Sequence, residues 1–303
     1  MTEKRVDKAT GTRTVGHEWD GIEELDTPMP RWWLISFYIT IAWGVLYVIF
    51  YPAWPLIDRG TEGLLGWTSR GQLAEQMSAV DQANASFREE LVRIPIERLS
   101  TDSDVFAKAV AGGRSAYQVN CSQCHGTGAA GSQKLGYPNL NDDDWLWGGD
   151  LKAIEYTLTN GIRQDEVTGT RQSAMPPFDG VFQASQMDAL VDHVRSLGGE
   201  VRPTNEGRRL FDDNCAACHG PSGQGNREIG APRLNDAIWL YGGSSEDIAR
   251  QIRTPRMGQM PHWGDRLDAA TIRMLAAYVW SLGGGEDFVE VAQDPEITVD
   301  DEP

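Results

Sequence analysis

The sequence is poor in cysteine and in basic residues. Only four of its 303 residues are cysteines, and all four lie in two short motifs, so no cysteine is left for a structural disulfide. Lysine and arginine number 27 against 44 aspartates and glutamates, a formal net charge of −17. Because a phosphate backbone requires a basic surface, nucleic acid is not expected as a partner.

The two cysteine motifs share the pattern Cys-X-X-Cys-His, at Cys121–His125 and Cys215–His219. This spacing is the attachment signature of a c-type haem. A zinc site would need two Cys-X-X-Cys arms converging on one ion, and a redox disulfide does not call for a histidine after each pair. The motifs therefore predict two covalently bound haem c groups. The attachment residues would be Cys121, Cys124, Cys215 and Cys218, and the proximal iron ligands His125 and His219.

One run of the sequence, residues 32–51, is apolar and contains no charged residue. At about 1.5 Å per residue it can cross a hydrocarbon core roughly 30 Å thick, and aromatic residues flank both of its ends. A signal peptide fits less well, because the run is longer than an h-region and Tyr-Pro-Ala-Trp-Pro is a poor cleavage site. A buried helix would rarely be so apolar throughout. We expect an uncleaved transmembrane anchor over residues 32–54.

Basic residues indicate how this anchor is oriented. Five lysines and arginines precede it, whereas only Arg59 and Arg70 follow within about 20 residues. The positive-inside rule predicts that the N-terminal arm, residues 1–31, is cytoplasmic. The haem motifs would then lie in the periplasm, on the outer face of a bacterial inner membrane. Haem attachment takes place outside the cytoplasm, which agrees with this topology.

Comparison of the sequence with itself reveals a repeat. At an offset of 94 residues the two cysteine motifs align, and beyond a loop near residues 161–170 the offset becomes 85. The repeats cover residues 104–199 and 202–285. Each predicts a helix before the motif, a short helix, a Met-Pro loop and a final amphipathic helix. The expected fold class is all-α: one transmembrane helix followed by two tandem cytochrome c domains.

Two further segments have no counterpart in the repeat. Residues 55–103 carry several charges and few large apolar clusters, which predicts a partly helical connector between the membrane and the haem domains. Residues 286–303 are rich in aspartate and glutamate, which predicts a disordered acidic tail.

The sixth ligand of each iron decides what such a haem can do. Met175 and Met260 each precede a proline and align in the repeat, so we predict that Met175 ligates the iron of His125 and Met260 that of His219. A methionine that merely fills a core gap is the alternative. Met257 is a nearby competitor for the second site.

The remaining histidines are weaker candidates. His262 could ligate an iron in principle, whereas His193 and His17 are expected to be structural or solvated. His193 stands where the second repeat has Tyr278, a position at which an aromatic residue is usual.

His/Met coordination raises the reduction potential relative to bis-His coordination and leaves no open position for a substrate. Such a haem transfers single electrons. The carbonyl groups of Pro138 and Pro232 are candidate acceptors for the Nδ1 protons of the proximal histidines. Trp145 and Trp239 either contact the haem and its propionates or pack in the core.

The two haem domains resemble class I cytochrome c in Cys-X-X-Cys-His-Gly, the following Pro-X-Leu and Met-Pro. The stretch from His17 to Trp33, HEWDGIEELDTPMPRWW, leading into a single anchor, resembles the CcoP (FixP) subunit of cbb3-type cytochrome c oxidases. The resemblance implies a subunit with no catalytic residues of its own. It would accept electrons from a donor cytochrome c and pass them through a monohaem subunit to the catalytic haem–copper subunit of a proton-pumping oxidase.

Other functions remain open from the residues alone. A dihaem peroxidase needs a haem that opens for peroxide, and two Met-Pro pairs count against it. A cytochrome subunit of a periplasmic dehydrogenase, or a free-standing dihaem shuttle, would have the same haem domains. Only the N-terminal arm discriminates, because it implies a fixed partner in the membrane.

Overall fold

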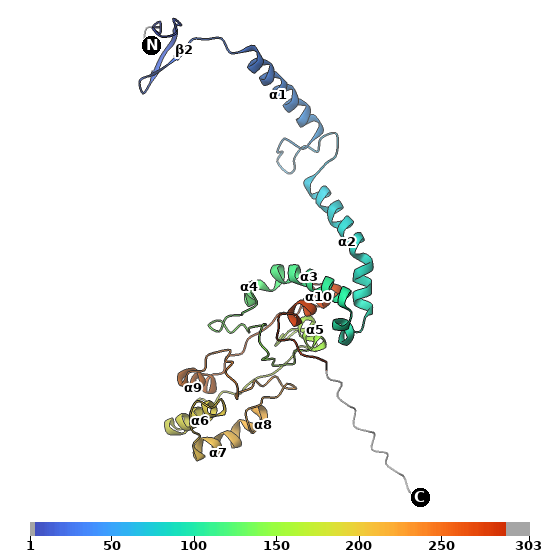
Figure 1. Ribbon diagram of the computed structural model, residues 1–303, viewed down its shortest axis with the longest axis vertical. Helices are drawn as coiled ribbons and strands as arrows, with labels where there is room; N and C mark the ends of the chain where they lie inside the picture. Colours follow the sequence, from blue (N-terminus) through green and yellow to red (C-terminus); the bar gives the residue numbers. More distant parts are fainter. Residues whose placement is uncertain (1–3, 289–303) are drawn as a thin grey trace. The chain divides into compact units, whose positions relative to one another are not determined.

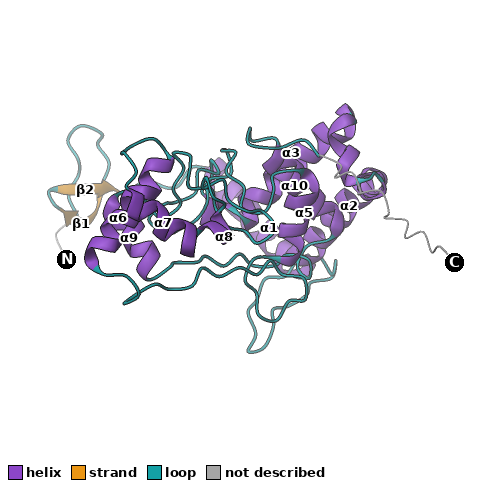
Figure 2. Cartoon of the chain, turned by 90° about the horizontal axis from the view of Figure 1, so that it is seen from below, coloured by secondary structure: helices purple, strands orange, loops and turns teal. Residues whose placement is uncertain are grey.

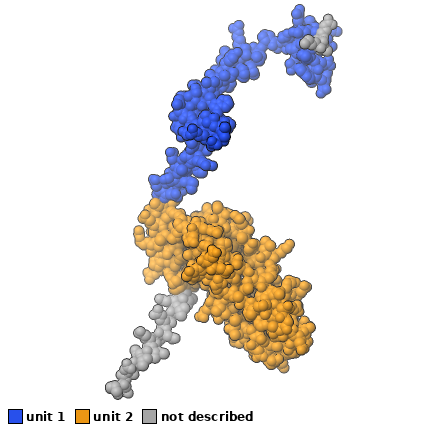
Figure 3. All heavy atoms as spheres, turned by 180° about the vertical axis from the view of Figure 1, so that it is seen from behind, with its two compact units in different colours: residues 1–83 blue, residues 84–303 orange. Residues whose placement is uncertain are grey.

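The computed structural model describes residues 4–288 of the chain. They fall into two compact units, with the division between residues 83 and 84 of the sequence (Figure 3). The first unit contains a hairpin and a long apolar helix, and the second contains both cysteine motifs.

The hairpin of the first unit pairs β1 (Thr14–Trp19) with β2 (Ile22–Leu25) in antiparallel register. Asp20 and Gly21 form its turn, both with positive φ, which suits a tight two-residue connection. We did not predict this hairpin in the N-terminal arm, although Asp-Gly is a common hairpin signal.

The anchor prediction corresponds to α1 (Arg31–Phe50), which begins after Pro30. Proline lacks the amide hydrogen that the first helical turn leaves unpaired, so it suits this position. The helix has a mean hydropathy of 2.0 and is long and apolar enough to cross a membrane. None of its residues is buried within the described part of the chain. The next helix, α2 (Ser69–Arg93), carries the chain into the second unit.

The named secondary-structure elements of the second unit are all helices, and long loops connect them (Figures 1 and 2). Aspartate, serine or threonine side chains cap the first amides of five of its helices, as helix N-termini prefer. Its elements are the 3₁₀ helix η1 (Ile96–Thr101), α3 (Ser103–Asn120), α4 (Ser122–His125), α5 (Leu151–Asn160), α6 (Ala184–Leu197), α7 (Asn205–Asn214), α8 (Ala216–His219), α9 (Ser245–Arg253) and α10 (Ala269–Trp280).

These helices form two lobes, each with its own hydrophobic core. The Cys121 lobe consists of α3, α4, α5 and α10, and the Cys215 lobe of α6, α7, α8 and α9. Both views show α3 beside α10, and α6 beside α7 and α9 (Figures 1 and 2). Each lobe therefore combines helices from both sequence repeats.

The short link between α6 and α7 explains why each lobe combines helices from both repeats. Only residues 198–204 connect the two helices, and such a link favours packing of consecutive helices against each other. The last helix of the first repeat thus pairs with the first helix of the second repeat. The first and last helices of the repeat region in sequence order, α3 and α10, then pair with each other.

Part of the predicted connector belongs to the Cys121 lobe. Leu91 and Leu99 are fully buried and, with Ile96, pack against Val105 of α3 and Met274 of α10. Burying a leucine side chain stabilises a fold by roughly 1.5–3 kcal/mol, so this segment adds to the stability of the lobe. The spacer prediction is therefore wrong for residues 91–99.

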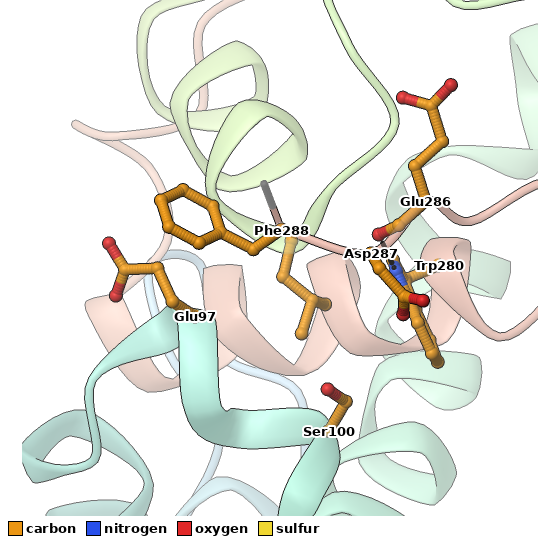
Figure 4. Close-up of a pocket in the computed structure, with 7 residues that line it drawn as sticks. Glu97, Ser100, Trp280, Glu286, Asp287 and Phe288 are labelled. Atoms are coloured by element: carbon orange, nitrogen blue, oxygen red, sulfur yellow. Dashed lines mark hydrogen bonds between the residues drawn. The ribbon is translucent and has the colours of Figure 1, made fainter. Parts of the chain in front are cut away.

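The first residues of the predicted acidic tail also pack on this lobe. The Glu286 amide donates to the Gly149 carbonyl at 2.9 Å, and the Trp280 indole donates to the Glu286 carbonyl at 2.8 Å. Figure 4 shows Phe288 and Glu286 lining a small surface pocket together with Glu97 of η1. The rest of the predicted disordered segment, 289–303, lies outside the described residues.

Candidate haem-binding sites

Each cysteine motif forms a single helical turn at the end of a longer helix. Cys121 ends α3 and begins α4, and the His125 amide donates to the Cys121 carbonyl at 3.0 Å. The second motif repeats this turn, with the His219 amide 2.9 Å from the Cys215 carbonyl. The glycine after each histidine ends the turn with a positive φ. The two motifs thus present their thiols and imidazoles in the same local geometry.

The histidine rings are held as the sequence predicted. His125 Nδ1 lies 3.1 Å from the Pro138 carbonyl oxygen, and His219 Nδ1 lies 3.0 Å from that of Pro232. A carbonyl oxygen only accepts, so Nδ1 carries the proton and Nε2 keeps its lone pair for a metal. Burial lowers the pKa of both histidines, although the proline carbonyls act in the opposite direction. The net result favours the neutral imidazole that iron ligation requires.

The cysteines fit haem attachment better than the alternative thiol chemistries. Burial raises the pKa of Cys121 and of Cys215 to about 11, so neither is a reactive thiolate at neutral pH. Among residues 4–288, no three cysteine, histidine or carboxylate side chains gather as a metal site would require. The two Cys-X-X-Cys arms therefore do not converge on one zinc ion.

The predicted pairing of the axial methionines does not match the structure. Met260 packs in the core of the Cys121 lobe, in the cluster that includes Cys121 and Tyr117. Met175 packs in the core of the Cys215 lobe, in the cluster that includes Cys215. The prediction assumed that each repeat folds on itself, whereas the Met-Pro loop and the last helix of each repeat pack in the lobe of the other repeat's motif. Met175 is thus placed with the second motif and Met260 with the first.

The other candidate ligands named from the sequence differ in their surroundings. Met257 is 43% exposed and lies outside the core clusters, whereas Met260 is half-buried. His262 Nε2 lies 3.4 Å from a carboxylate oxygen of Asp265. His17 is exposed and stacks on the Trp19 ring.

His193 is a core residue of the Cys215 lobe. Its side chain is buried, and its ring centroid lies 5.1 Å from that of Phe211. Neither ring nitrogen has a hydrogen-bond partner within the described chain. Burial lowers the pKa of His193, which favours the neutral ring. The structural role expected for this histidine agrees with its position.

The two tryptophans pack in equivalent places. Trp145 contacts the core of the Cys121 lobe, and Trp239 that of the Cys215 lobe. The Trp145 indole donates to the Gly284 carbonyl at 2.6 Å, so its N–H group is already paired. Core packing is therefore the role that these contacts support for Trp145.

Sequence reasoning missed Arg163, which ties the two Met-Pro loops together. Its Nε donates to the Ser173 carbonyl and its Nη1 to the Gly258 carbonyl, both at 2.7 Å. Each acceptor lies two residues before a Met-Pro pair. Arg163 belongs to the loop that the second repeat lacks, so comparison of the repeats offered no signal for it.

Comparison with known proteins agrees with the assignment of the two cysteine motifs to cytochrome c domains. The family model "N-terminal domain of cytochrome oxidase-cbb3, FixP" matches residues 11–58, and "Cytochrome C oxidase, cbb3-type, subunit III" matches residues 108–194 and 202–279. The chain is 47% identical over 278 residues to the cbb3-type cytochrome c oxidase subunit CcoP of Cereibacter sphaeroides, covering 90% of this chain and 95% of the relative.

Two further relatives are similar over nearly their whole length. The cbb3-type cytochrome c oxidase subunit FixP of Rhizobium meliloti is 46% identical, with 93% of this chain and 98% of the relative covered. FixP of Azorhizobium caulinodans is 45% identical, with 93% and 96% covered. Identity at this level across the hairpin, the anchor and both haem motifs shows that the chain belongs to the CcoP/FixP family of cbb3-type cytochrome c oxidase subunits.

Proposed function

We propose that this chain is a membrane-anchored dihaem relay. It accepts single electrons from a donor cytochrome c and delivers them to the haem–copper core of a cbb3-type oxidase through a monohaem cytochrome subunit. The chain itself carries out no oxygen chemistry.

One observation carries this proposal. The chain holds two equivalent sites, each with a Cys-X-X-Cys-His turn, a proximal histidine oriented by a proline carbonyl, and a half-buried methionine in the same core. Methionine as the sixth ligand closes the iron to substrates and favours a high reduction potential. Two closed sites in one chain suit transfer of electrons rather than catalysis.

The residues fit two c-type haems. Cys121 and Cys124 would hold one, and Cys215 and Cys218 the other, with His125 and His219 as the proximal ligands. When bound, each haem supplies a one-electron iron couple. The protein holds each histidine in the tautomer that leaves Nε2 free, and it surrounds the site with apolar side chains.

Membrane anchoring through α1 would keep the relay next to integral oxidase subunits. The excess of lysine and arginine before α1 supports a cytoplasmic hairpin and periplasmic lobes. The match of residues 11–58 to the N-terminal domain of FixP supports a fixed partner in the membrane. It thus favours the oxidase over a periplasmic dehydrogenase or a free-standing shuttle.

Purification of the native complex tests this function. Membranes are solubilised gently, the chain is captured through a C-terminal tag, and haem c per chain, haem b, copper and oxygen consumption are measured. We expect two haem c per chain, with haem b, copper and cyanide-sensitive oxygen consumption in the same fraction. A dihaem protein without haem b or copper, in a complex shown by crosslinking before solubilisation to be intact, would contradict the oxidase assignment.

The acidic surface predicts a salt-dependent reaction with a basic donor. Residues 55–303 carry 22 lysines and arginines against 37 aspartates and glutamates, before any haem propionates are counted. Opposite charges raise association rates by about 10–1000-fold at low ionic strength. We expect the second-order rate of electron uptake from a basic cytochrome c to fall at least about tenfold as salt is raised to 0.5 M.

Stopped-flow reduction of the purified dihaem protein measures this rate. An acidic donor cytochrome of similar potential is the control, and its rate should rise or stay constant with salt because repulsion is screened. Equal, flat salt responses of the two donors would show that the acidic surface does not steer the donor.

A further inference from the structure

One arginine contacts the loops that lead to the methionines of both haem sites. Arg163 donates from Nε to the carbonyl of Ser173 and from Nη1 to that of Gly258, both at 2.7 Å. Ser173 lies two residues before Met175, and Gly258 lies two residues before Met260. We propose that Arg163 is a positioning residue shared by the two haem sites: its guanidinium holds both Met-Pro loops in place, and its charge raises both reduction potentials. This inference rests on the proposed function, because it requires methionine as the sixth ligand of both irons.

The backbone that carries this guanidinium is itself bonded to one of the two loops. The amides of Ile162 and Met260 each donate to the other residue's carbonyl, at 3.0 and 3.1 Å. The Arg163 amide donates to the Arg171 carbonyl at 2.9 Å, and the Arg171 amide donates to the Gly161 carbonyl at 3.1 Å. Arg163 is therefore fixed relative to Met260, and its side chain extends this connection to the other Met-Pro loop.

Arg163 also has an uncommon backbone conformation. Its φ is 56°, in the left-handed region that residues other than glycine rarely adopt. Such a conformation persists only where the surrounding structure holds it, and it occurs preferentially at functional sites. The bridge between Ile162 and Met260 and the two bonds of the guanidinium supply this restraint. The backbone thus directs one side chain toward two loops.

The guanidinium lies where the two lobes meet. A Cβ atom on Gly258 would lie 3.6 Å from the Gly136 carbonyl oxygen and 3.7 Å from the Tyr241 hydroxyl oxygen. Gly136 belongs to the loop after the first cysteine motif, and a Cβ atom on it would overlap the ring of Tyr241, which lies in the second repeat. Arg256 stacks on the same ring, with its Cζ atom 4.8 Å from the ring centroid. One acceptor of Arg163 is thus part of the contact between the lobes, where a charge can act on both sites.

The acceptors of Arg163 do not compensate its charge. Both are neutral carbonyls, and the side chain is half-buried. Burial lowers the pKa of Arg163, but a guanidinium remains protonated at neutral pH. Reduction adds an electron to an iron, so a positive charge nearby stabilises the reduced state and raises the potential. At an effective dielectric constant of about 20, a unit charge roughly 12 Å away changes a one-electron equilibrium about tenfold.

Redox titration of the full-length, haem-loaded protein tests this role, together with carbon monoxide binding to the reduced form. In Arg163→Met, we expect the equilibrium constant for reduction to fall about threefold to tenfold at both haems. A tenfold change corresponds to about 59 mV for one electron. Carbon monoxide should bind faster than in wild type, in a reaction whose amplitude accounts for both haems, because each loop has lost a bond that holds it.

Two further variants separate the bonds from the charge. Arg163→Lys keeps the charge but lacks the planar fork that reaches both carbonyls. We expect carbon monoxide binding close to that of Arg163→Met and potentials between those of Arg163→Met and wild type. Arg256→Met is the matched control, because it removes a neighbouring, exposed charge and leaves the bonds of Arg163 intact. It should leave carbon monoxide binding unchanged and shift the reduction equilibria less than about twofold, since water and salt screen an exposed charge.

A change at only one of the two haems in Arg163→Met would overturn the shared role. So would wild-type carbon monoxide binding in Arg163→Lys, or equal shifts of the potentials in Arg163→Met and Arg256→Met. Where Arg163→Met does not accumulate, carbon monoxide binding to Arg163→Lys decides. Two haem c per unmodified chain, with unchanged potentials in Arg163→Met, would overturn this inference and leave the proposed function standing. Fewer than two haems in the unmodified protein would contradict that function itself.

Discussion

Gly113→Ala is expected to lower the free energy of unfolding of the Cys121 lobe by about 3 kcal/mol or more. Overpacking a core typically costs about 1–3 kcal/mol, and the overlap here is with backbone atoms. The added methyl group would overlap the backbone carbonyl of Met274 and would lie 2.7 Å from the Cβ atom of Tyr278. Neither atom belongs to the flexible end of a side chain, so α3 and α10 would have to separate. Alanine is the better helix former by about 1 kcal/mol, which offsets only part of this loss.

Gly112→Ala is the matched control for this prediction. The nearest atoms to a Cβ atom on Gly112 all belong to the side chain of Met274, whose flexible thioether can rotate away. We expect this variant to be close to wild type in stability. Thermal unfolding of the haem-loaded protein, followed through haem absorbance, compares the two. Similar melting temperatures for both variants would show that α3 and α10 do not pack through Gly113.

Arg273→Met is expected to destabilise the protein by about 2–3 kcal/mol, because Arg273 and Glu155 form a partly buried ion pair, between the about 0–1 kcal/mol of an exposed pair and the about 3–5 kcal/mol of a buried one. Arg273 Nε donates to a Glu155 carboxylate oxygen at 2.9 Å. Its Nη1 donates to the carbonyls of Leu91, Val92 and Ile94, at 2.6–2.8 Å, at the end of α2. Without the guanidinium, the carbonyls at the negative end of the helix dipole lose their hydrogen-bond donor, and the partly buried Glu155 carboxylate loses its ion-pair partner.

Arg250→Met is the control for Arg273→Met. Arg250 pairs with two carboxylates on its own helix, Glu246 and Asp247, at the protein surface. Exposed pairs contribute about 0–1 kcal/mol, so little change is expected. Urea unfolding of both variants measures the difference in the free energy of unfolding. Losses of equal size would contradict a structural role for the Arg273 contacts.

Features that depend on nearby residues were predictable from the sequence. Pro138 follows His125 by 13 residues, and Pro232 follows His219 by the same interval, so the repeat itself indicated how each histidine is held. The helices next to each motif and the apolar α1 helix also follow from local patterns. Leu91 and Leu99 were missed, because a short apolar stretch interrupted by charged residues, LVRIPIERL, does not reveal a core that forms with a distant helix.

The similarity between the two repeats did not reveal which helix packs against the last helix of each repeat. Residues 184–197 and 269–280 align with each other, so either helix could pack on α3 as far as the repeat shows. The choice depends on the seven residues, 198–204, that join α6 directly to α7. That length was visible in the sequence, and it could have indicated in which lobe Met175 and Met260 pack.

The combination of helices from both repeats in each lobe also determines what a shortened chain would lose. All four helices of the Cys215 lobe lie within Ala184–Arg253, whereas the Cys121 lobe needs α10, whose last residue is Trp280. During synthesis, the first motif is made long before the helix that covers it, and its lobe is the last to close. A premature stop codon shortly after residue 253 would therefore leave the second haem motif with its complete set of helices. The first motif, more than a hundred residues upstream of the missing sequence, would lose α10, which its lobe needs to fold.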